Sequence, residues 1–133
     1  MSPPAAAARI VVAMGLVLAG LLAGSEYVVH PWAVGGRSME PALHHGDRVL
    51  VDRWTYRQRP PQVGEVLLVL GPSSRPMVKR VARVEPGSNA VWVLGDNAAA
   101  SNDSRRFGGV PRASVRGRVV FRYWPPSRVG PVR

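Results

Sequence analysis

The chain has 133 residues, enough for one small domain, and carries a formal net charge of +10. It has no cysteine, which excludes a thiol nucleophile, a disulfide framework and a thiolate metal site, and only three histidines. The charge suits an anionic lipid surface, whereas no helix-turn-helix, zinc-finger or aromatic RNA-binding signature accompanies it. We therefore expect no metal, no cofactor and no nucleic-acid partner.

An uninterrupted apolar run, Ile10–Gly24, follows a short N-terminal tail of residues 1–9. As a helix it spans about 22 Å, short of the ~30 Å hydrocarbon core, although residues up to 29 could extend it. The run has no polar face, which argues against a buried helix of a soluble protein. It predicts a single transmembrane anchor over residues 10–29. A cleaved signal peptide is the alternative, because Ala23-Gly24-Ser25 is a tolerable cleavage site.

The remainder, residues 30–133, is predicted to be mainly β, a small antiparallel sheet that forms the catalytic domain. With 14 Gly and 13 Pro in the chain, frequent turns are expected in place of long helices. Short apolar or alternating runs between turn residues predict strands over residues 48–52, 65–70, 77–84, 90–94 and 115–123.

The first segment with candidate chemistry surrounds Ser38. Gly35 and Gly36 leave room for a substrate backbone to approach, and Pro41 favours an extended conformation at Glu40. Ser38 thus lies in an open, turn-like segment that suits a nucleophile, although an ordinary loop serine would show the same features.

The second segment contains Lys79, the only lysine among 18 basic residues. Lysine can lose its proton whereas arginine effectively cannot, so a lone lysine is a candidate base. It lies on a predicted apolar strand, where burial would lower its pKa. The alternative is an edge-strand lysine that faces water.

The third segment, Gly95–Arg105, concentrates polar side chains within 11 residues. It predicts either a plain turn or a buried network in which Asp103 and Arg105 pair and Ser101 orients a neighbour.

In this order, the three segments resemble the conserved boxes of the type I signal peptidase family. Ser38-Met39-Glu40-Pro41 matches the serine box, Lys79-Arg80-Val81 the lysine box, and Gly95–Arg105 the Gly-Asp-Asn and Ser-x-Asp-Ser-Arg elements. The resemblance covers roughly residues 35–130.

The resemblance implies a role for each matched residue. Ser38 would attack the scissile carbonyl, and neutral Lys79 would take its proton. Ser101 would hydrogen-bond Lys79 and orient it, while Asp103 and Arg105 would brace the site. The backbone N–H of Ser38 would contribute to the oxyanion hole.

The resemblance also implies a substrate-binding surface. Gly36 stands where some family members have a serine that is a second oxyanion donor, which leaves that donor in doubt. The expected substrate-binding residues are Met39, Pro41, Gly95, Asp96 and Asn97. The substrate would bind extended, as an added strand. From their chemistry and position, Met39, Trp32 and Trp54 are expected to contact lipid.

The implied function is a membrane-bound serine endopeptidase that removes N-terminal leader peptides from precursor proteins, with its domain on the extracytoplasmic side. The few residues between Lys79 and Gly95 make a minimal member of the family. This brevity resembles the nickel superoxide dismutase maturation peptidases, so a dedicated maturation peptidase is one alternative. An inactive, basic, membrane-associated module is the other.

Overall fold

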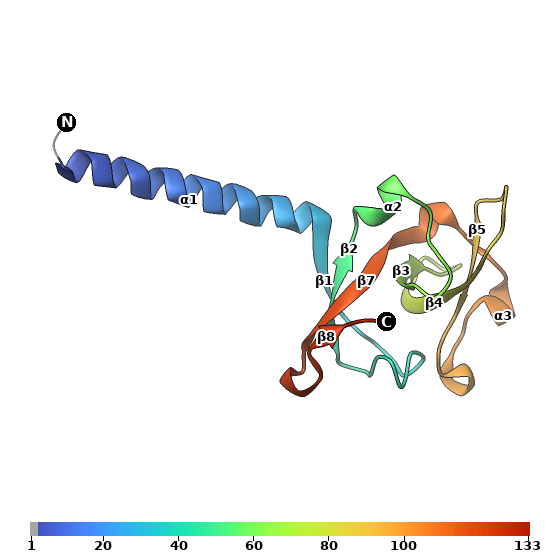
Figure 1. Cartoon of the computed structure of the whole chain (residues 1–133). Helices are drawn as coiled ribbons and strands as arrows, with labels where there is room; N and C mark the ends of the chain where they lie inside the picture. Colours follow the sequence, from blue (N-terminus) through green and yellow to red (C-terminus); the bar gives the residue numbers. More distant parts are fainter. Residues whose placement is uncertain (1–2) are drawn as a thin grey trace.

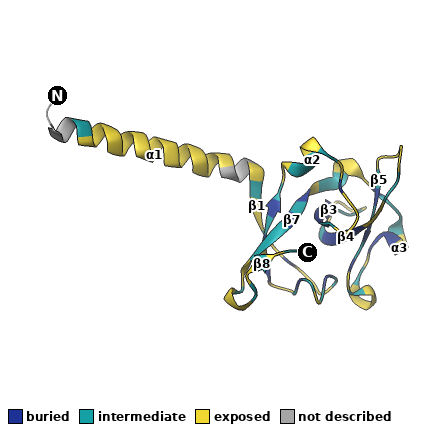
Figure 2. Cartoon of the chain, in the orientation of Figure 1, coloured by how far each residue is buried: buried dark blue, intermediate teal, exposed yellow. Residues whose placement is uncertain are grey.

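A long N-terminal helix leads directly into a domain built from strands (Figure 1). The computed structural model describes residues 3–133, apart from the side chains of residues 3–5 and 25–27. The helix, α1 (Pro3–Val28), contains one stretch, Ala6–Gly24, that is long and apolar enough to cross a membrane. Figure 2 shows residues 7–24 of this helix exposed, whereas buried residues gather among the strands.

The helix differs from the predicted anchor at both ends. Residues 3–9 of the predicted tail are already helical, and residues 1 and 2 lie outside the described residues. The helix ends at Val28, because Val29 already pairs with Asp52 in the sheet. Residues 5–8 before Arg9 are all alanine, the strongest helix former, so the helix can begin ahead of the apolar run.

The domain is one antiparallel sheet. Its strands are β1 (Val29–Ala33), β2 (Arg48–Asp52), β3 (Val66–Leu70), β4 (Pro76–Val84), β5 (Ala90–Leu94), β6 (Val110–Pro111), β7 (Val115–Trp124) and β8 (Gly130–Pro131). Their order is β1-β2-β7-β3-β4-β5-β6, and β8 pairs with β7. Short helices connect them: α2 (Thr55–Gln58), α3 (Ser104–Phe107) and the 3-10 turns η1 (Ala98–Ala100), η2 (Arg112–Ser114) and η3 (Pro126–Arg128).

The predicted fold class, a mainly antiparallel β domain after one apolar helix, is confirmed. Five strands lie within one residue of their predicted bounds, because each is an apolar run between turn residues. Sequence reasoning missed β1, β6 and β8. β1 contains Pro31, which weakens a strand signal, and the other two have only two residues each.

Both faces of the sheet are covered, which explains why β3 is apolar at every position. Val66 and Leu68 belong to one buried cluster, whereas Leu67 and Val69 belong to the other. Successive strand residues point to opposite faces, so a strand buried on both sides needs no polar position.

The loop between β1 and β2, residues 34–47, covers one of these faces. Val34, Met39 and Leu43 enter the same cluster as Val66 and Leu68. Met39 is only 1% exposed. The expected lipid contact of Met39 is therefore wrong, and the side chain offers a substrate almost no surface: the residue after Ser38 anchors the loop in the core.

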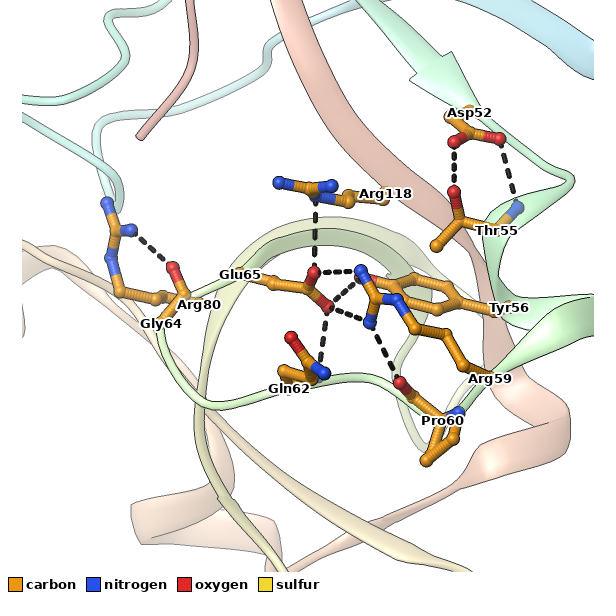
Figure 3. Close-up of polar contacts among 10 residues, drawn as sticks. All are labelled: Asp52, Thr55, Tyr56, Arg59, Pro60, Gln62, Gly64, Glu65, Arg80 and Arg118. Atoms are coloured by element: carbon orange, nitrogen blue, oxygen red, sulfur yellow. Dashed lines mark hydrogen bonds and ion pairs between the residues drawn. The ribbon is translucent and has the colours of Figure 1, made fainter.

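A polar cluster around Glu65 fixes α2 and the segment before β3 (Figure 3). The carboxylate of Glu65 accepts hydrogen bonds from the hydroxyl of Tyr56, the backbone N–H of Gln62 and the guanidinium of Arg59. Arg118 of β7 forms an ion pair with it at 3.4 Å. Burial alone would raise the pKa of Glu65, but these donors hold it below its ordinary value, so the carboxylate is ionised at neutral pH.

Candidate active site

Ser38 and Lys79, 41 positions apart in the chain, meet in the fold. Ser38 lies in the loop between β1 and β2, and Lys79 lies in β4. The Nζ atom of Lys79 is 2.7 Å from the Oγ atom of Ser38. This is the distance over which a serine hydroxyl can pass its proton to an amine.

Lys79 is buried, with only 4% of its surface exposed. It shares its side of β4 with Met77 and Val81, because alternate strand residues point the same way. Burial lowers the pKa of Lys79; the charge of Asp103 acts against this, and that of Arg105 adds to it. The environment therefore favours the neutral amine that a general base requires.

One edge of β4 is open beside this pair. The partner strand β5 pairs with β4 only from Arg80 to Val84, so residues 76–79 pair with β3 alone. A cavity of about 420 Å³ lies there, lined by Gly35, Gly36 and Ser38 together with residues 75–79. The space can receive an extended backbone next to the Ser38 hydroxyl.

Gly95 lets the third segment approach Ser38 closely. A Cβ atom at this position would lie 2.6 Å from the carbonyl oxygen of Ser38 and 2.2 Å from the Oγ atom of Ser101. The backbone N–H of Asn97 donates to that same Ser38 carbonyl at 2.8 Å. A side chain at Gly95 would therefore push the serine loop away from β4.

Asp103 is the centre of a buried network. It is fully buried and accepts hydrogen bonds from the backbone N–H of Gly95, the hydroxyl of Ser101 and the guanidinium of Arg105. The Arg105 guanidinium is the main reason that the pKa of Asp103 lies far below its ordinary range. The predicted network is therefore present, with one difference. Ser101 donates to Asp103 at 2.5 Å, and among the described residues it makes no hydrogen bond with Lys79.

The remaining predicted residues lie around the serine loop. Asp96 forms a two-point ion pair with Arg80, at 2.8 and 2.7 Å, and the Asn97 side chain donates to the carbonyl of Arg37. Asp96 thus fastens the segment after β5 to β4, and Asn97 fastens it to the serine loop. Gly36 lines the cavity, whereas Pro41 is exposed and lies outside it.

Sequence reasoning missed a group of residues that hold the loop carrying Ser38 in place. Asp47 is fully buried and pairs with Arg122, at 3.1 Å, and with Arg128. It also accepts from the backbone N–H of His44 at 2.9 Å. The Nδ1 atom of His45 accepts from the backbone N–H of Gly36 at 2.9 Å. In the sequence Gly46-Asp47 is a turn signal, and the two arginines that pair with Asp47 lie more than 70 positions away.

Asp103→Ala and Ser101→Ala should differ in how much they lower the free energy of unfolding. We expect Asp103→Ala to lower the free energy of unfolding by about 2 kcal/mol, because it leaves the Gly95 N–H without its acceptor. Arg105 is 44% exposed and can return to water, which limits the loss. Ser101→Ala removes one hydrogen bond, for a loss of about 1 kcal/mol. Denaturant unfolding and turnover of both variants measure this; equal losses of stability would contradict it.

Comparison with known proteins agrees with this fold. The family model described as "Signal peptidase, peptidase S26" matches residues 6–88 and 82–124. The chain is a serine endopeptidase. It belongs to the signal peptidase family, peptidase S26, whose members remove leader peptides from precursor proteins. The two matches overlap at residues 82–88, at the end of β4 and in the turn before β5, within the short connection between Lys79 and Gly95.

Several curated proteins are similar to most of the chain. One is the mitochondrial ATP-independent inner membrane protease subunit 1a of Arabidopsis thaliana, 32% identical, with 81% of this chain and 78% of the relative covered. Another is the probable signal peptidase I-1 of Synechocystis, 28% identical, with 88% and 81% covered. A third is the mitochondrial inner membrane protease subunit 1 of Xenopus tropicalis, 29% identical, with 81% and 77% covered. With the apolar helix, these relatives indicate a membrane protein.

Proposed function

We propose that this peptidase cleaves leader peptides with Ser38 as nucleophile and Lys79 as general base. The observation that carries the proposal is the 2.7 Å contact between the Ser38 hydroxyl and a buried lysine amine. An inactive module would have no reason to bury its only lysine against a serine, at the desolvation cost of that amine. The relatives, signal peptidases and organellar proteases, favour leader processing over dedicated maturation of a nickel superoxide dismutase.

The proposed reaction has two halves. Neutral Lys79 takes the hydroxyl proton as Ser38 Oγ attacks the scissile carbonyl, and the resulting ammonium gives a proton to the leaving amine. Water then attacks the acyl-enzyme ester, with Lys79 again as base. The backbone N–H of Ser38 donates to no acceptor within residues 3–133, so it is available to the oxyanion. The backbone N–H of Gly36, in contrast, already donates to the Nδ1 atom of His45.

We expect the leader peptide to bind as an extended strand along residues 76–79. The unpaired edge of β4 and the cavity beside Ser38 support this. Family resemblance implies small residues, typically alanine, just before the cut. Gly35 and Gly36 line the cavity and have no side chains that would fill it, so space remains for the peptide.

The test uses purified full-length protein and a panel of precursors, with the cut site read by mass spectrometry. We expect one cut after a small residue at the end of each leader. Ser38→Ala should abolish it, and Ser127→Ala, at an exposed serine of η3, should leave the rate unchanged. Cleavage that survives Ser38→Ala would refute the proposed nucleophile.

We further propose that α1 stays in the mature protein as a single membrane span, with the β domain on the extracytoplasmic side. The 19-residue apolar stretch supports the span, and family resemblance suggests the side. N-terminal sequencing of protein from membranes should start before Ile10. Protease added to right-side-out vesicles should digest the domain. A mature start near Glu26, with activity in the soluble fraction, would exclude the anchor.

A further inference from the structure

Four arginines line a cavity of about 250 Å³ that is separate from Ser38. They are Arg53, Arg57, Arg112 and Arg116, and the lining is completed by Tyr56 and Val115. The cavity joins α2 and the end of β2 to the start of β7. Its lining contains no carboxylate, so the cavity is strongly positive.

The nearest acidic groups already have partners (Figure 3). Asp52 accepts hydrogen bonds from the backbone N–H groups of Trp54 and Thr55 and from the Thr55 hydroxyl. Glu65 is held by Arg59 and Arg118. Within the described part of the chain, no carboxylate pairs with the side chains of Arg53, Arg57, Arg112 or Arg116. These charges are therefore available to an external anion.

An apolar cavity of about 220 Å³ adjoins the positive one. The two share Arg53 and Arg116, and the second is otherwise lined by His30, Trp32, Val51 and Leu68. Arg53 and Arg116 thus line both the positive cavity and a second one whose exposed lining is mostly apolar. A ligand that fills both must carry an anionic group next to an apolar body.

Both cavities lie at the end of the membrane-spanning helix. The backbone N–H of Arg53 donates to the carbonyl of Val28, the last residue of α1, at 2.8 Å. The next residue, Trp54, is 49% exposed, and the guanidinium of Arg57 lies over its ring at 5.8 Å. Exposed tryptophan and arginine at the end of a span are typical of the headgroup region of a bilayer.

We propose that these adjoining cavities bind one anionic phospholipid of the surrounding bilayer. The phosphate lies among the four arginines, and the glycerol and upper acyl chain enter the apolar cavity beside Trp32. Charge complementarity and the position at the end of α1 select a lipid over a soluble anion. The inference rests on the membrane attachment proposed above. A bound lipid would fix the domain against the bilayer.

The test titrates the full chain in detergent with phosphatidylglycerol, phosphatidylcholine or inorganic phosphate, and counts bound molecules by native mass spectrometry. We expect one phosphatidylglycerol to be retained, and neither of the others. Arg53→Gln/Arg116→Gln should weaken its binding by about 25-fold, at about fivefold for each arginine. The matched control, Arg106→Gln/Arg133→Gln, removes the same charge from exposed positions outside both cavities and should change binding less than about twofold.

Three results would overturn the inference: equal retention of phosphatidylcholine, equal binding of inorganic phosphate, or equal weakening in the control variant. Precursor cleavage by the same variants in detergent shows whether the lipid site or the proposed peptidase activity is at fault. Intact cleavage together with unselective lipid binding rejects the lipid site alone. Recovery of the mature protein without α1 rejects the membrane attachment and the lipid site together.

Discussion

Lys79→Arg is expected to lower the rate of leader cleavage by a factor on the order of 10² or more, the usual scale for losing a general base. The guanidinium keeps the positive charge and a similar stem but cannot give up its proton near neutral pH. The 2.7 Å contact with Ser38 Oγ would then join the nucleophile to a permanent cation. Single-turnover cleavage of a precursor measures the effect. A folded variant that cuts at the wild-type rate would end the Ser38/Lys79 mechanism.

Lys79→Met is the matched control, because it fills the same buried space without a charge. Burial lowers the pKa of Lys79, so the folded state binds its proton less tightly than the unfolded state does. This cost to stability is complete below the folded pKa and fades as the pH rises toward about 10.4, the pKa of unfolded lysine. We expect the inactive Met variant to be more stable than the wild type at neutral pH, and this difference to shrink at alkaline pH. Wild-type cleavage should rise with pH through an apparent pKa below that of free lysine.

Asp47→Ala is expected to lower the free energy of unfolding by about 3–5 kcal/mol, the usual cost of removing one partner from a buried ion pair. Arg122, with only 17% of its side chain exposed, would lose its carboxylate, and Arg128 would lose the same partner. The loop that carries Ser38 would lose the tie between Asp47 and the His44 N–H. We therefore expect turnover to fall with stability, because Ser38 is no longer held against Lys79.

Denaturant unfolding and precursor cleavage test this variant against Glu85→Ala. This control removes a carboxylate that pairs with exposed Arg83 and also accepts from the Trp92 indole N–H and the Ser88 hydroxyl, and it should cost no more than about 1–2 kcal/mol. Burial alone would raise the pKa of Asp47, but the His44 N–H and the two guanidiniums hold it below its ordinary value. Its contribution is therefore complete above about pH 3.9, the unfolded pKa, and is lost as the pH falls through the folded pKa. An Asp47→Ala protein as stable as Glu85→Ala would show that the loop does not depend on this network.

Local sequence determined the apolar helix and five of the eight strands. Each of these strands is a short run bounded by turn residues, and such a run depends on neighbours in the chain. The residue types of the site were visible for a similar reason. A lone lysine, a serine after Gly35-Gly36 and a polar run from Gly95 are unusual locally, and three ordered boxes match one family.

The tertiary structure decided the partners that the sequence left open or assigned differently. Ser101 donates to Asp103 in place of Lys79, Met39 enters the core, and Asp47 joins a turn to two distant arginines. Each outcome depends on which strands lie side by side and how deeply a side chain is buried. Strand neighbours and side-chain burial arise from packing between segments far apart in the chain. They cannot be predicted from the spacing of residues within one segment.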